Sequence, residues 1–417
     1  MFNPFSSVPP KIIVTRFSVF GSKAGGLRLR DKFGENTDEF ANRLFDPNRL
    51  QTRLDILTNI SAPAISMVSE EFNVRHLVQY SNNLPAPFKE ALLETSERYE
   101  SFCPVVVSES NMADSVDHEV RSWGKAFRGL FSWTRLDDDD LLSKSFFESL
   151  NNYVNENSVG MAITFPKQAA TLYSNGLVTD FHCQFVRNPS AGQTYICRAN
   201  NSLEVLETPG FPAHHEIDRK MPTVVDPTIV GSLQILHATQ DTSSFDSPLG
   251  GRLINRLSQL NGYGVMNLGE VKSEFPNLID RSRFAKNSEY DAVFELGSGQ
   301  ANSGRGAEVF KPGSVYRIDY VLSAERSVGN DSTLCFRFSD PGSSKGHFPR
   351  TPERGDYLRL YSDKNGEGSA FVVIPEGSNL QQVRLNYEGP QENLVSGKFK
   401  VKRAGDPEVA RIISREG

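Results

Sequence analysis

Four consecutive aspartates, Asp137 to Asp140, form a dense set of side chains with the chemistry to hold a cation. They stand in the stretch TRLDDDDLLSKSFFESL, between an apolar, β-prone segment and a segment with helical spacing. Because like charges at this spacing repel one another, the folded chain gains from them only where a positive charge lies among them. A solvated surface loop is the alternative interpretation, since most charge runs lie in solvent.

A hard divalent cation would supply that positive charge. Mg²⁺ and Mn²⁺ prefer oxygen ligands, typically one or two carboxylates together with substrate phosphates and waters. Such a metal neutralises the diphosphate of a nucleotide and stabilises it as a leaving group. The acidic run therefore predicts a metal site. A nucleotide-diphosphate sugar fits that site, because cleavage of its C1–O bond leaves negative charge on the diphosphate.

The segments around the aspartates alternate between strand-like and helix-like patterns. Strand patterns cover residues 11–20, 73–80, 103–110, 129–136 and 159–165, and helix patterns cover 46–61, 85–99, 115–127 and 141–154. Asp46 and Pro47 predict the start of the first helix, as its cap and its first residue. The alternation predicts an α/β fold with a mostly parallel, doubly wound sheet and helices on both faces. The aspartates would then follow the carboxyl end of a central strand, where such sheets bind ligands.

The pattern changes after about residue 290. From there the chain consists of short β-like runs separated by Gly, Pro, Asn and Asp, which predicts an all-β sandwich or jelly roll. The sequence thus predicts two domains, residues 1–285 and 286–417. Aromatic residues of the second domain fall at strand spacing, which favours a place in its core over stacking on sugar rings: Tyr316, Tyr320, Phe336, Phe338, Tyr357, Tyr361 and Tyr387.

Composition and charge narrow the class of protein. The chain has 417 residues and a net charge of −6 at pH 7, which argues against a general nucleic-acid binder with a basic face. We find neither a window of ~20 apolar residues that would span a bilayer nor a secretory signal, so a cytoplasmic location is expected. The four cysteines lack C-x-x-C spacing and a clustered His, which predicts buried, reduced thiols rather than a zinc or redox site.

Several blocks of the sequence resemble one known family. The acidic stretch and RFSVF on the first strand are joined, in the right order, by LFDPNRLQTRLDILTNISAPAI, LVQYSNNLPAPFKEAL and GMAITFPKQAATLY. Over about residues 11–285, the chain resembles the rhamnosyl-transferase family of bacterial GT-A-type glycosyltransferases. The resemblance implies a GT-A-like (Rossmann-like) mixed, mostly parallel sheet, with Mn²⁺ or Mg²⁺ as cofactor. It also implies transfer of a sugar from a nucleotide-diphosphate sugar to a bacterial surface polysaccharide such as a capsule, exopolysaccharide or O-antigen.

The same resemblance implies a glycan or a lipid-linked glycan as the acceptor. A lipid-linked acceptor would bring the protein to the inner membrane as a peripheral protein. The β-sandwich lies outside the resemblance, and its fold alone assigns no function. We expect it either to bind the growing glycan or to pair subunits in a homo-oligomer.

The resemblance also implies roles for the individual acids. The first acid of the motif faces the nucleotide in such families and a later one binds the metal, which makes Asp137 the nucleotide-side acid and Asp139 the metal ligand. Asp138 or Asp140 would support them, through water or by holding the ligands in place. Because adjacent residues of an extended chain point alternately, we expect Asp137 and Asp139 to share one side. The run of four acids leaves the register open, so Asp137 and Asp140 are further candidate ligands.

Other polar residues follow the predicted strands. Arg16 ends the first strand and is a candidate for the base or diphosphate of the nucleotide, with a structural ion pair as the alternative. Arg135 directly precedes the acids, and we expect it to pair with one of them at the nucleotide site. Asn82 or Asn83 follows the second strand and is placed to bind the nucleoside, although an ordinary Asn–Pro turn explains both equally well.

A late histidine is the next candidate. GT-A enzymes often place one on the metal or diphosphate, and the resemblance implies that role for His237, which follows the strand-like SLQIL. A structural histidine is the alternative. Asp241 and Ser243 lie close by in the sequence and are candidates for the same site.

An inverting transferase needs a base that deprotonates the acceptor hydroxyl. The stretch FPAHHEIDRK offers Glu216 first and Asp218 second, beside His214 and His215. An exposed loop is the alternative interpretation, and a retaining enzyme would need no such base.

Two other functions use the same residues. A nucleotidyltransferase or another α/β phosphate enzyme would use the acids with a Gly-rich phosphate loop, and GSKAGGLRLR after the first strand is an irregular version of one. A glycan-binding protein without catalytic activity would hold structural calcium with them instead.

Overall fold

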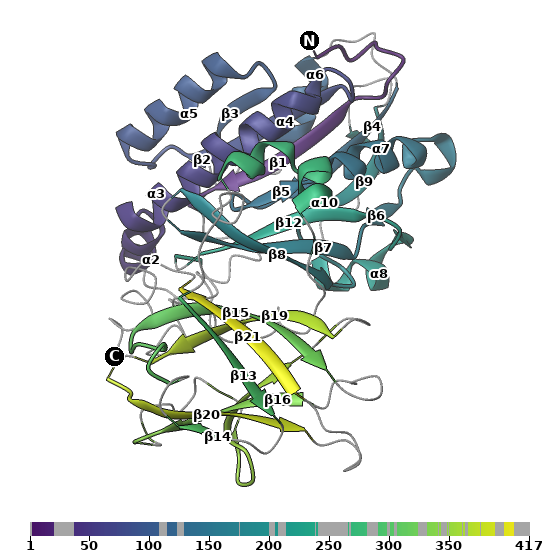
Figure 1. The fold of residues 1–417 in the computed structure, drawn as a ribbon. Coiled ribbons are helices and arrows are strands. Elements are labelled where there is room, and N and C mark those ends of the chain that lie inside the picture. Colours follow the sequence, from purple (N-terminus) through teal and green to yellow (C-terminus); the bar gives the residue numbers. More distant parts are fainter. Residues whose placement is uncertain are drawn as a thin grey trace. The chain divides into compact units, whose positions relative to one another are not determined.

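A computed structural model of the chain is shown in Figure 1. It describes residues 2–20, 37–107, 115–122, 129–174, 176–199, 205–206, 214–237, 239–240, 266, 268–281, 291–297, 301–303, 307–323, 332–340, 342, 348, 350–360, 362, 366–375, 377–387 and 396–403. Contacts divide the chain into a first unit, Met1–Ala169, Phe185–Ile235 and Asn267–Arg281, and a second unit, Ala170–Gln184, Leu236–Met266 and Ser282–Gly417. The domain boundary predicted at 285/286 lies outside the described residues and stays a prediction.

A large mixed sheet organises the first unit. Its strands are β1 (Lys11–Phe17), β2 (Val74–Ser81), β3 (Phe102–Val107), β4 (Leu130–Leu136), β6 (Ala162–Thr164), β9 (Gln193–Ala199), β10 (Val205–Leu206) and β11 (Thr223–Val225). They run in the order β11-β6-β9-β4-β1-β2-β3, with β10 beside β9. The strands β3, β2, β1 and β4 are parallel, whereas β9 is antiparallel to β4 and β6. The prediction of an α/β fold with a mostly parallel sheet is confirmed, and β9 is the strand that makes the sheet mixed.

Helices cover both faces of this sheet. They are α2 (Thr37–Leu44), α3 (Pro47–Ile56), the π-helical turn η1 (Leu57–Ser61), α4 (Ala62–Ser69), α5 (Ala86–Arg98), α6 (Ser115–Ser122), α7 (Lys144–Tyr153), α8 (Ile217–Lys220) and α10 (Leu268–Glu274), with short 3₁₀ turns η2 (Glu156–Ser158), η3 (His214–Glu216) and η4 (Pro276–Arg281). On one face Phe17 packs with Leu50 of α3 and Phe102. On the other face Ile12 packs with Val120 of α6. Alternating residues of β1 thus bury their side chains on opposite faces.

The helix predicted over residues 46–61 begins as expected and then changes pitch. Asp46 accepts hydrogen bonds from the amides of Asn48 and Arg49, with Pro47 as the first helical residue. At the π-helical turn η1, the amide of Ala62 donates to the carbonyl of Leu57 five residues back. Pro63 follows this turn and has no amide hydrogen for the normal bond to residue 59, which favours the wider turn at this point.

A second sheet has the order β5-β12-β7-β8, formed by β5 (Asp140–Leu142), β12 (Val230–Leu236), β7 (Lys167–Ser174) and β8 (Leu177–Phe185). Leu141 and Leu142 lie in β5 and pair with β12, so the helix predicted from residue 141 begins only at Lys144. Ser143 caps that helix by accepting a hydrogen bond from the amide of Phe146. A strand thus follows the acidic run directly, where a helix was expected.

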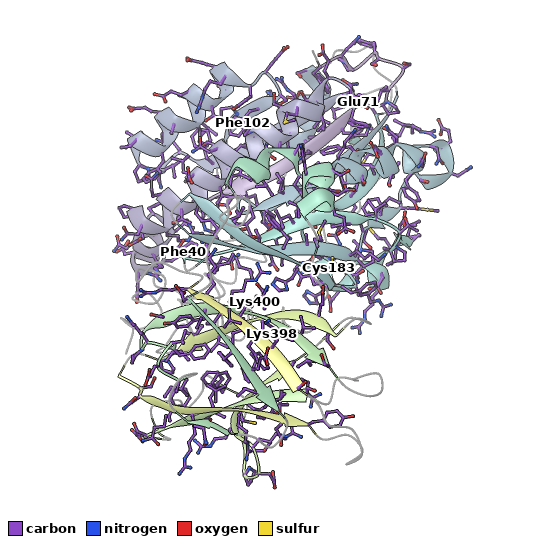
Figure 2. All side chains as sticks on the ribbon, in the orientation of Figure 1. Phe40, Glu71, Phe102, Cys183, Lys398 and Lys400 are labelled. Carbon is purple, nitrogen blue, oxygen red and sulfur yellow. The ribbon has the colours of Figure 1, made fainter. Side chains whose placement is uncertain are left out.

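The C-terminal part of the second unit contains two antiparallel sheets. Their strands are β13 (Ala292–Gly297), β14 (Ala301–Ser303), β15 (Ser314–Ser323), β16 (Ser332–Phe338), β17 (Arg350–Thr351), β18 (Gly355–Leu360), β19 (Glu367–Ile374), β20 (Leu380–Tyr387) and β21 (Ser396–Arg403), in the orders β13-β21-β15-β19 and β14-β20-β16-β18-β17. Residues of both sheets form one core, as a sandwich requires. On β21, Phe399 is buried while Lys398 and Lys400 are exposed (Figure 2).

The aromatic residues of this part lie mainly in its core, as predicted. Tyr316, Tyr320, Phe336 and Phe338 are buried. Tyr357 and Tyr387 are half-buried, and Tyr361 lies outside the described residues. In the described ranges, no helix combines the length and the apolar character required to cross a bilayer.

The buried His76 of β2 makes the stability of the first unit sensitive to acid. Its Nε2 lies 2.9 Å from Oγ1 of Thr15, and burial lowers its pKa from 6.5 to about 3. The folded state therefore keeps this ring neutral, whereas the unfolded chain protonates it below pH 6.5. The free energy of unfolding decreases as the pH is lowered from 6.5 to 3. We expect His76 alone to cost about 2 kcal/mol of unfolding free energy between pH 7 and pH 5. Urea denaturation of the wild type and of His76→Gln at both pH values tests this, and an equal loss in both proteins would contradict it.

Candidate functional site

Asp137, Asp138 and Asp139 lie in a tight turn after β4 rather than in an extended segment, and Asp140 is the first residue of β5. The amide of Asp140 donates to the carbonyl of Asp137 at 3.2 Å. Asp138, Asp139 and Asp140 are buried, whereas the side chain of Asp137 is half-buried. The placement of Asp137 and Asp139 on one side stays a prediction. Asp138 and Asp139 contact a common partner.

That common partner is Arg53, which comes from α3. Its Nη1 makes an ion pair with Oδ1 of Asp138, and its Nη2 lies 3.5 Å from Oδ2 of Asp139. All three side chains are buried, with at most 10% of each exposed. A guanidinium group suits this position because its planar fork reaches two carboxylates at once. The repulsion within the acidic run is therefore relieved in part by an arginine distant in the sequence.

Asp137 has different cationic neighbours. Arg135, two residues earlier, donates to Oδ1 of Asp137 from Nε at 3.2 Å and Nη2 at 3.0 Å, as the sequence predicted. Ser190 donates to Oδ2 at 2.9 Å. Burial by itself would raise the pKa of Asp137. The charges of Arg135 and Arg16 and these hydrogen bonds outweigh burial and lower that pKa to about 2, so the carboxylate is ionised at neutral pH.

Arg16 ends β1 beside these groups. Burial and the neighbouring Arg135 lower its pKa, and the charges of Asp137 and Asp138 oppose that shift. Unlike Arg135, it makes no hydrogen bond or close ion pair within the part of the chain that the structure describes. The structural ion pair considered for Arg16 is thus not formed with these residues. Its side chain is half-buried at the carboxyl end of β1.

The repulsion among the four carboxylates acts most strongly on Asp140. Burial first, and then the charges of Asp139, Asp137 and Asp138, raise its pKa well above the usual value, although the backbone of Ile235 donates a hydrogen bond that opposes the shift. Its Oδ1 is buried and has no hydrogen-bond partner among the described residues. The carboxyl group is therefore held in a site that favours either a proton or an added cation.

The donor atoms of the turn are compatible with one divalent cation. In the described ranges, no cluster of three or more His, Cys, Asp or Glu side chains has the geometry of a metal site. Mg²⁺ needs fewer protein ligands where substrate phosphates complete its shell, commonly one or two carboxylates. Asp139 and Asp140 are adjacent, buried carboxylates, and the unpaired Oδ1 of Asp140 is the oxygen that such an ion would satisfy.

A loop before β9 links the acidic turn with one predicted catalytic acid. Ser190 of this loop contacts Asp137, and two earlier residues contact Asp218. Asn188 donates to Oδ1 of Asp218 at 3.0 Å, and Nη2 of Arg187 lies 2.7 Å from Oδ2. Both acids are thus held by one short segment, residues 187–190.

Glu216, the first candidate for the catalytic base, ends η3 and is half-buried. His214 beside it is half-buried, and its carbonyl accepts a hydrogen bond from Nε2 of Gln193 at 3.3 Å. His215 is exposed. The base roles of Glu216 and Asp218 stay predictions.

Asn82 and Asn83 lie at the carboxyl end of β2, which is parallel to and beside β1, so they share an edge of the sheet with Arg16. Both side chains are exposed in a turn closed by the amide of Leu84, which donates to the carbonyl of Ser81. The turn interpretation therefore holds for their backbone, and the proposed nucleoside contact of Asn82 stays a prediction.

His237 directly follows β12 and is buried. Its Nδ1 lies 2.9 Å from Oγ1 of Thr239, and its carbonyl accepts a hydrogen bond from the amide of Gln240. It belongs to the second unit, and its role as a metal ligand stays a prediction. Asp241 and Ser243 lie outside the described residues.

The interpretation of the sequence missed Arg53, Ser190 and Asn188. A signal for Arg53 was present, because Arg49 and Arg53 stand four residues apart and directly beside the apolar stripe of Leu50 and Leu54. Charged residues beside the apolar stripe of a helix are partly buried and need partners of opposite charge or hydrogen-bond acceptors. Ser190 and Asn188 lie in a polar loop without periodicity, and no local pattern distinguishes them.

Comparisons with known proteins place this site within a family. A family model described as "Putative rhamnosyl transferase" matches residues 11–246. No match is found among curated proteins. One similar solved structure is "Mannosyltransferase PcManGT from Pyrobaculum calidifontis in complex with GDP-Man and Mn2+", with 10% identity, a TM-score of 0.29 and coverage of 63% of this chain and 64% of that chain. Another is the inositol-1-phosphate CTP transferase from T. maritima, with 14% identity, a TM-score of 0.27 and coverage of 60% and 96%.

The chain therefore spans less than two thirds of the length of the mannosyltransferase. The family match includes β1 with Arg16, Arg53 on α3, the acidic turn and the loop with Ser190. It extends over residues 11–246 of 417, more than half of the chain. The chain belongs to the family of glycosyltransferases described as "Putative rhamnosyl transferase".

Proposed function

We propose that this chain is a metal-dependent glycosyltransferase with a GT-A-like catalytic domain. It would move a sugar from a nucleotide-diphosphate sugar to a bacterial surface polysaccharide, such as a capsule, exopolysaccharide or O-antigen. The observation that carries this proposal is the acidic turn with its arginines, which lies inside the family match at the carboxyl edge of β1 and β4. Open α/β sheets bind their ligands at this edge, and the charges there suit a diphosphate.

The donor would be held from both sides of its diphosphate. Arg16 supplies a guanidinium group for the phosphate oxygens, since arginine binds phosphate through two parallel hydrogen bonds. Asp137, with Arg135, would contact the nucleoside side, and Asn82 lies at the same edge of the sheet. Asp139 and Asp140 would hold Mn²⁺ or Mg²⁺. When bound, the metal neutralises the charge that collects on the leaving diphosphate.

The acceptor hydroxyl would lose its proton to a carboxylate in an inverting reaction. The bond from the acceptor oxygen to C1 forms as the bond from C1 to the diphosphate breaks, and Glu216 or Asp218 takes the proton. The loop of residues 187–190 supports this arrangement, because it contacts both Asp218 and Asp137. The acceptor would be a glycan or a lipid-linked glycan, the latter with peripheral association at the inner membrane. The β-sandwich would bind that glycan or pair subunits.

A donor screen tests this function. We expect uridine, guanosine, thymidine and cytidine diphosphates to differ in how much they raise Tm. We also expect the largest rise in Tm to require Mn²⁺, because the metal would neutralise both the carboxylates of the turn and the diphosphate. The matching nucleotide sugar should then release its nucleoside diphosphate when an acceptor is added. Release of pyrophosphate or phosphate would identify a different α/β phosphate enzyme, and sugar binding without any donor turnover would identify a glycan-binding protein.

A further inference from the structure

Two buried arginines stand one turn apart on α3 and have different partners. Nη1 of Arg49 donates to Oγ of Ser18 at 2.8 Å and to the carbonyl of Leu44 at 3.0 Å. Arg53 instead contacts the carboxylates of Asp138 and Asp139. Both arginines are 6% exposed. The same helix therefore provides one arginine to the acidic turn and an equally buried one to Ser18 and Leu44.

The segment that follows Arg53 contacts the acidic turn a second time. Oγ of Ser61 donates to the carbonyl of Asp140 at 2.8 Å. Ser61 ends the π-helical turn η1, which shifts the residues after Leu57 relative to a regular α-helix. Nδ2 of Asn277 donates to the carbonyl of Ile60 at 2.7 Å and adds a second contact to this turn. Residues 53–61 thus hold the acidic turn through one charged contact and one backbone contact.

The charged contact is required by the burial of its partners. Asp138 and Asp139 are adjacent and each less than a tenth exposed, so their charges repel one another in a region of low dielectric. Removal of one partner from a buried ion pair leaves an uncompensated charge, which is strongly destabilising. A cation must therefore be present whenever both carboxylates are ionised. Arg53 meets that requirement without a bound metal.

We propose that Arg53 is a positioning residue that serves as a built-in counter-ion: it holds the acidic turn in shape before a divalent cation binds, and it competes with that cation for Asp139. The inference rests on the proposed metal-dependent function. It goes beyond that function because Arg53 would compensate part of the negative charge of the acidic turn whether or not a metal is bound. The turn then keeps its shape when metal and nucleotide leave, and the affinity for metal is lower than the four carboxylates alone would give.

The test compares the wild type with Arg53→Gln and Arg49→Gln as full chains without donor. Titration calorimetry with MnCl₂ measures the metal affinity, and Tm is measured in EDTA and in saturating Mn²⁺. We expect Arg53→Gln to bind Mn²⁺ about tenfold more tightly than the wild type, because a repulsive charge a few ångströms from the metal is removed. Its Tm in EDTA should fall, and Mn²⁺ should raise that Tm more than it raises the Tm of the wild type.

Arg49→Gln is the matched control, because it removes an arginine of equal burial from the same helix. It should lower Tm as well, while its Mn²⁺ affinity stays at the wild-type value. Arg53→Lys keeps the charge and, if Arg53→Gln fails to fold, provides the test. One ammonium group cannot reach two carboxylates as a fork does, so this variant should have a lower Tm in EDTA and an Mn²⁺ affinity close to that of the wild type.

Equal Mn²⁺ affinity in Arg53→Gln and the wild type would overturn the proposal, as would an equal gain of affinity in Arg49→Gln. An Arg53→Lys protein with the Tm of the wild type in EDTA would overturn it too. Failure of the proposed function is a separate result: a wild type that turns over no nucleotide sugar would reject that function. Mn²⁺ binding that appears only when Arg53 is removed would support the built-in counter-ion even then.

Discussion

Asp139→Asn is expected to lower kcat/KM for the nucleotide sugar by about 100-fold, the usual cost of losing one electrostatic contact at the developing charge. The asparagine keeps the shape of the side chain and one oxygen, but it removes the negative charge that would attract Mn²⁺ or Mg²⁺. Steady-state kinetics at saturating Mn²⁺ measure this effect. Calorimetry should show weaker Mn²⁺ binding in the same variant.

Asp138→Asn is the matched comparison for this prediction. It also removes a carboxylate that contacts Arg53, and Asp138 is the partner with the closer contact. If Asp139 is the metal ligand, Asp138→Asn should lower Tm at least as much as Asp139→Asn while it lowers kcat/KM less. Equal loss of activity in both variants would show that the turn works only as a unit, and full activity of Asp139→Asn would reject the metal role of Asp139.

Much of the fold was predictable because its signals are local. The apolar spacing of Leu50, Leu54 and Leu57 and the pair Asp46–Pro47 predicted the start of α3, and the structure begins that helix at Pro47. Runs of β-branched and aromatic residues predicted β1, β2 and β4 in their observed positions. In a helix the pattern depends on residues three or four positions apart, and in a strand on residues two positions apart. A single sequence therefore contains the information that predicts these elements.

Features that depend on distant pairing were missed. The strand β9 joins the large sheet beside β4, from more than fifty residues further along the chain, and makes that sheet mixed. Leu141 and Leu142 fit the spacing of the helix that follows them, yet β12 pairs with them and makes them a strand. Tertiary pairing of this kind overrides local propensity, and a single sequence does not show it.

The acids of the candidate site could be named from the sequence, but their electrostatics could not. Arg53 is 85 residues from Asp138, and Ser190 is 53 residues from Asp137. Only the fold brings these groups into contact. Ser190 helps to lower the pKa of Asp137, whereas burial and the neighbouring acids raise the pKa of Asp140. Arginines supply positive charge beside the aspartates, and the metal expected there stays a prediction.

Arg16→Gln is expected to weaken the binding of the nucleoside diphosphate by about 10- to 100-fold, the value of a lost charge-assisted hydrogen bond. Its guanidinium is half-buried at the carboxyl end of β1, and burial and Arg135 lower its pKa. A cation held in that environment without a close ion pair among the described residues costs stability, which a bound diphosphate would recover. Fluorescence or calorimetric titration with the diphosphate identified by the donor screen measures the effect.

The stability of the same variant separates a binding role from a structural one. If Arg16 serves the donor, Arg16→Gln should have a Tm close to that of the wild type, because the charge that it removes is buried and only partly compensated by Asp137 and Asp138. Arg135→Gln should behave in the opposite way, since it breaks the ion pair that keeps Asp137 ionised. A clear loss of Tm in Arg16→Gln together with unchanged diphosphate affinity would make Arg16 part of the framework, and the donor would then have to be held by other groups.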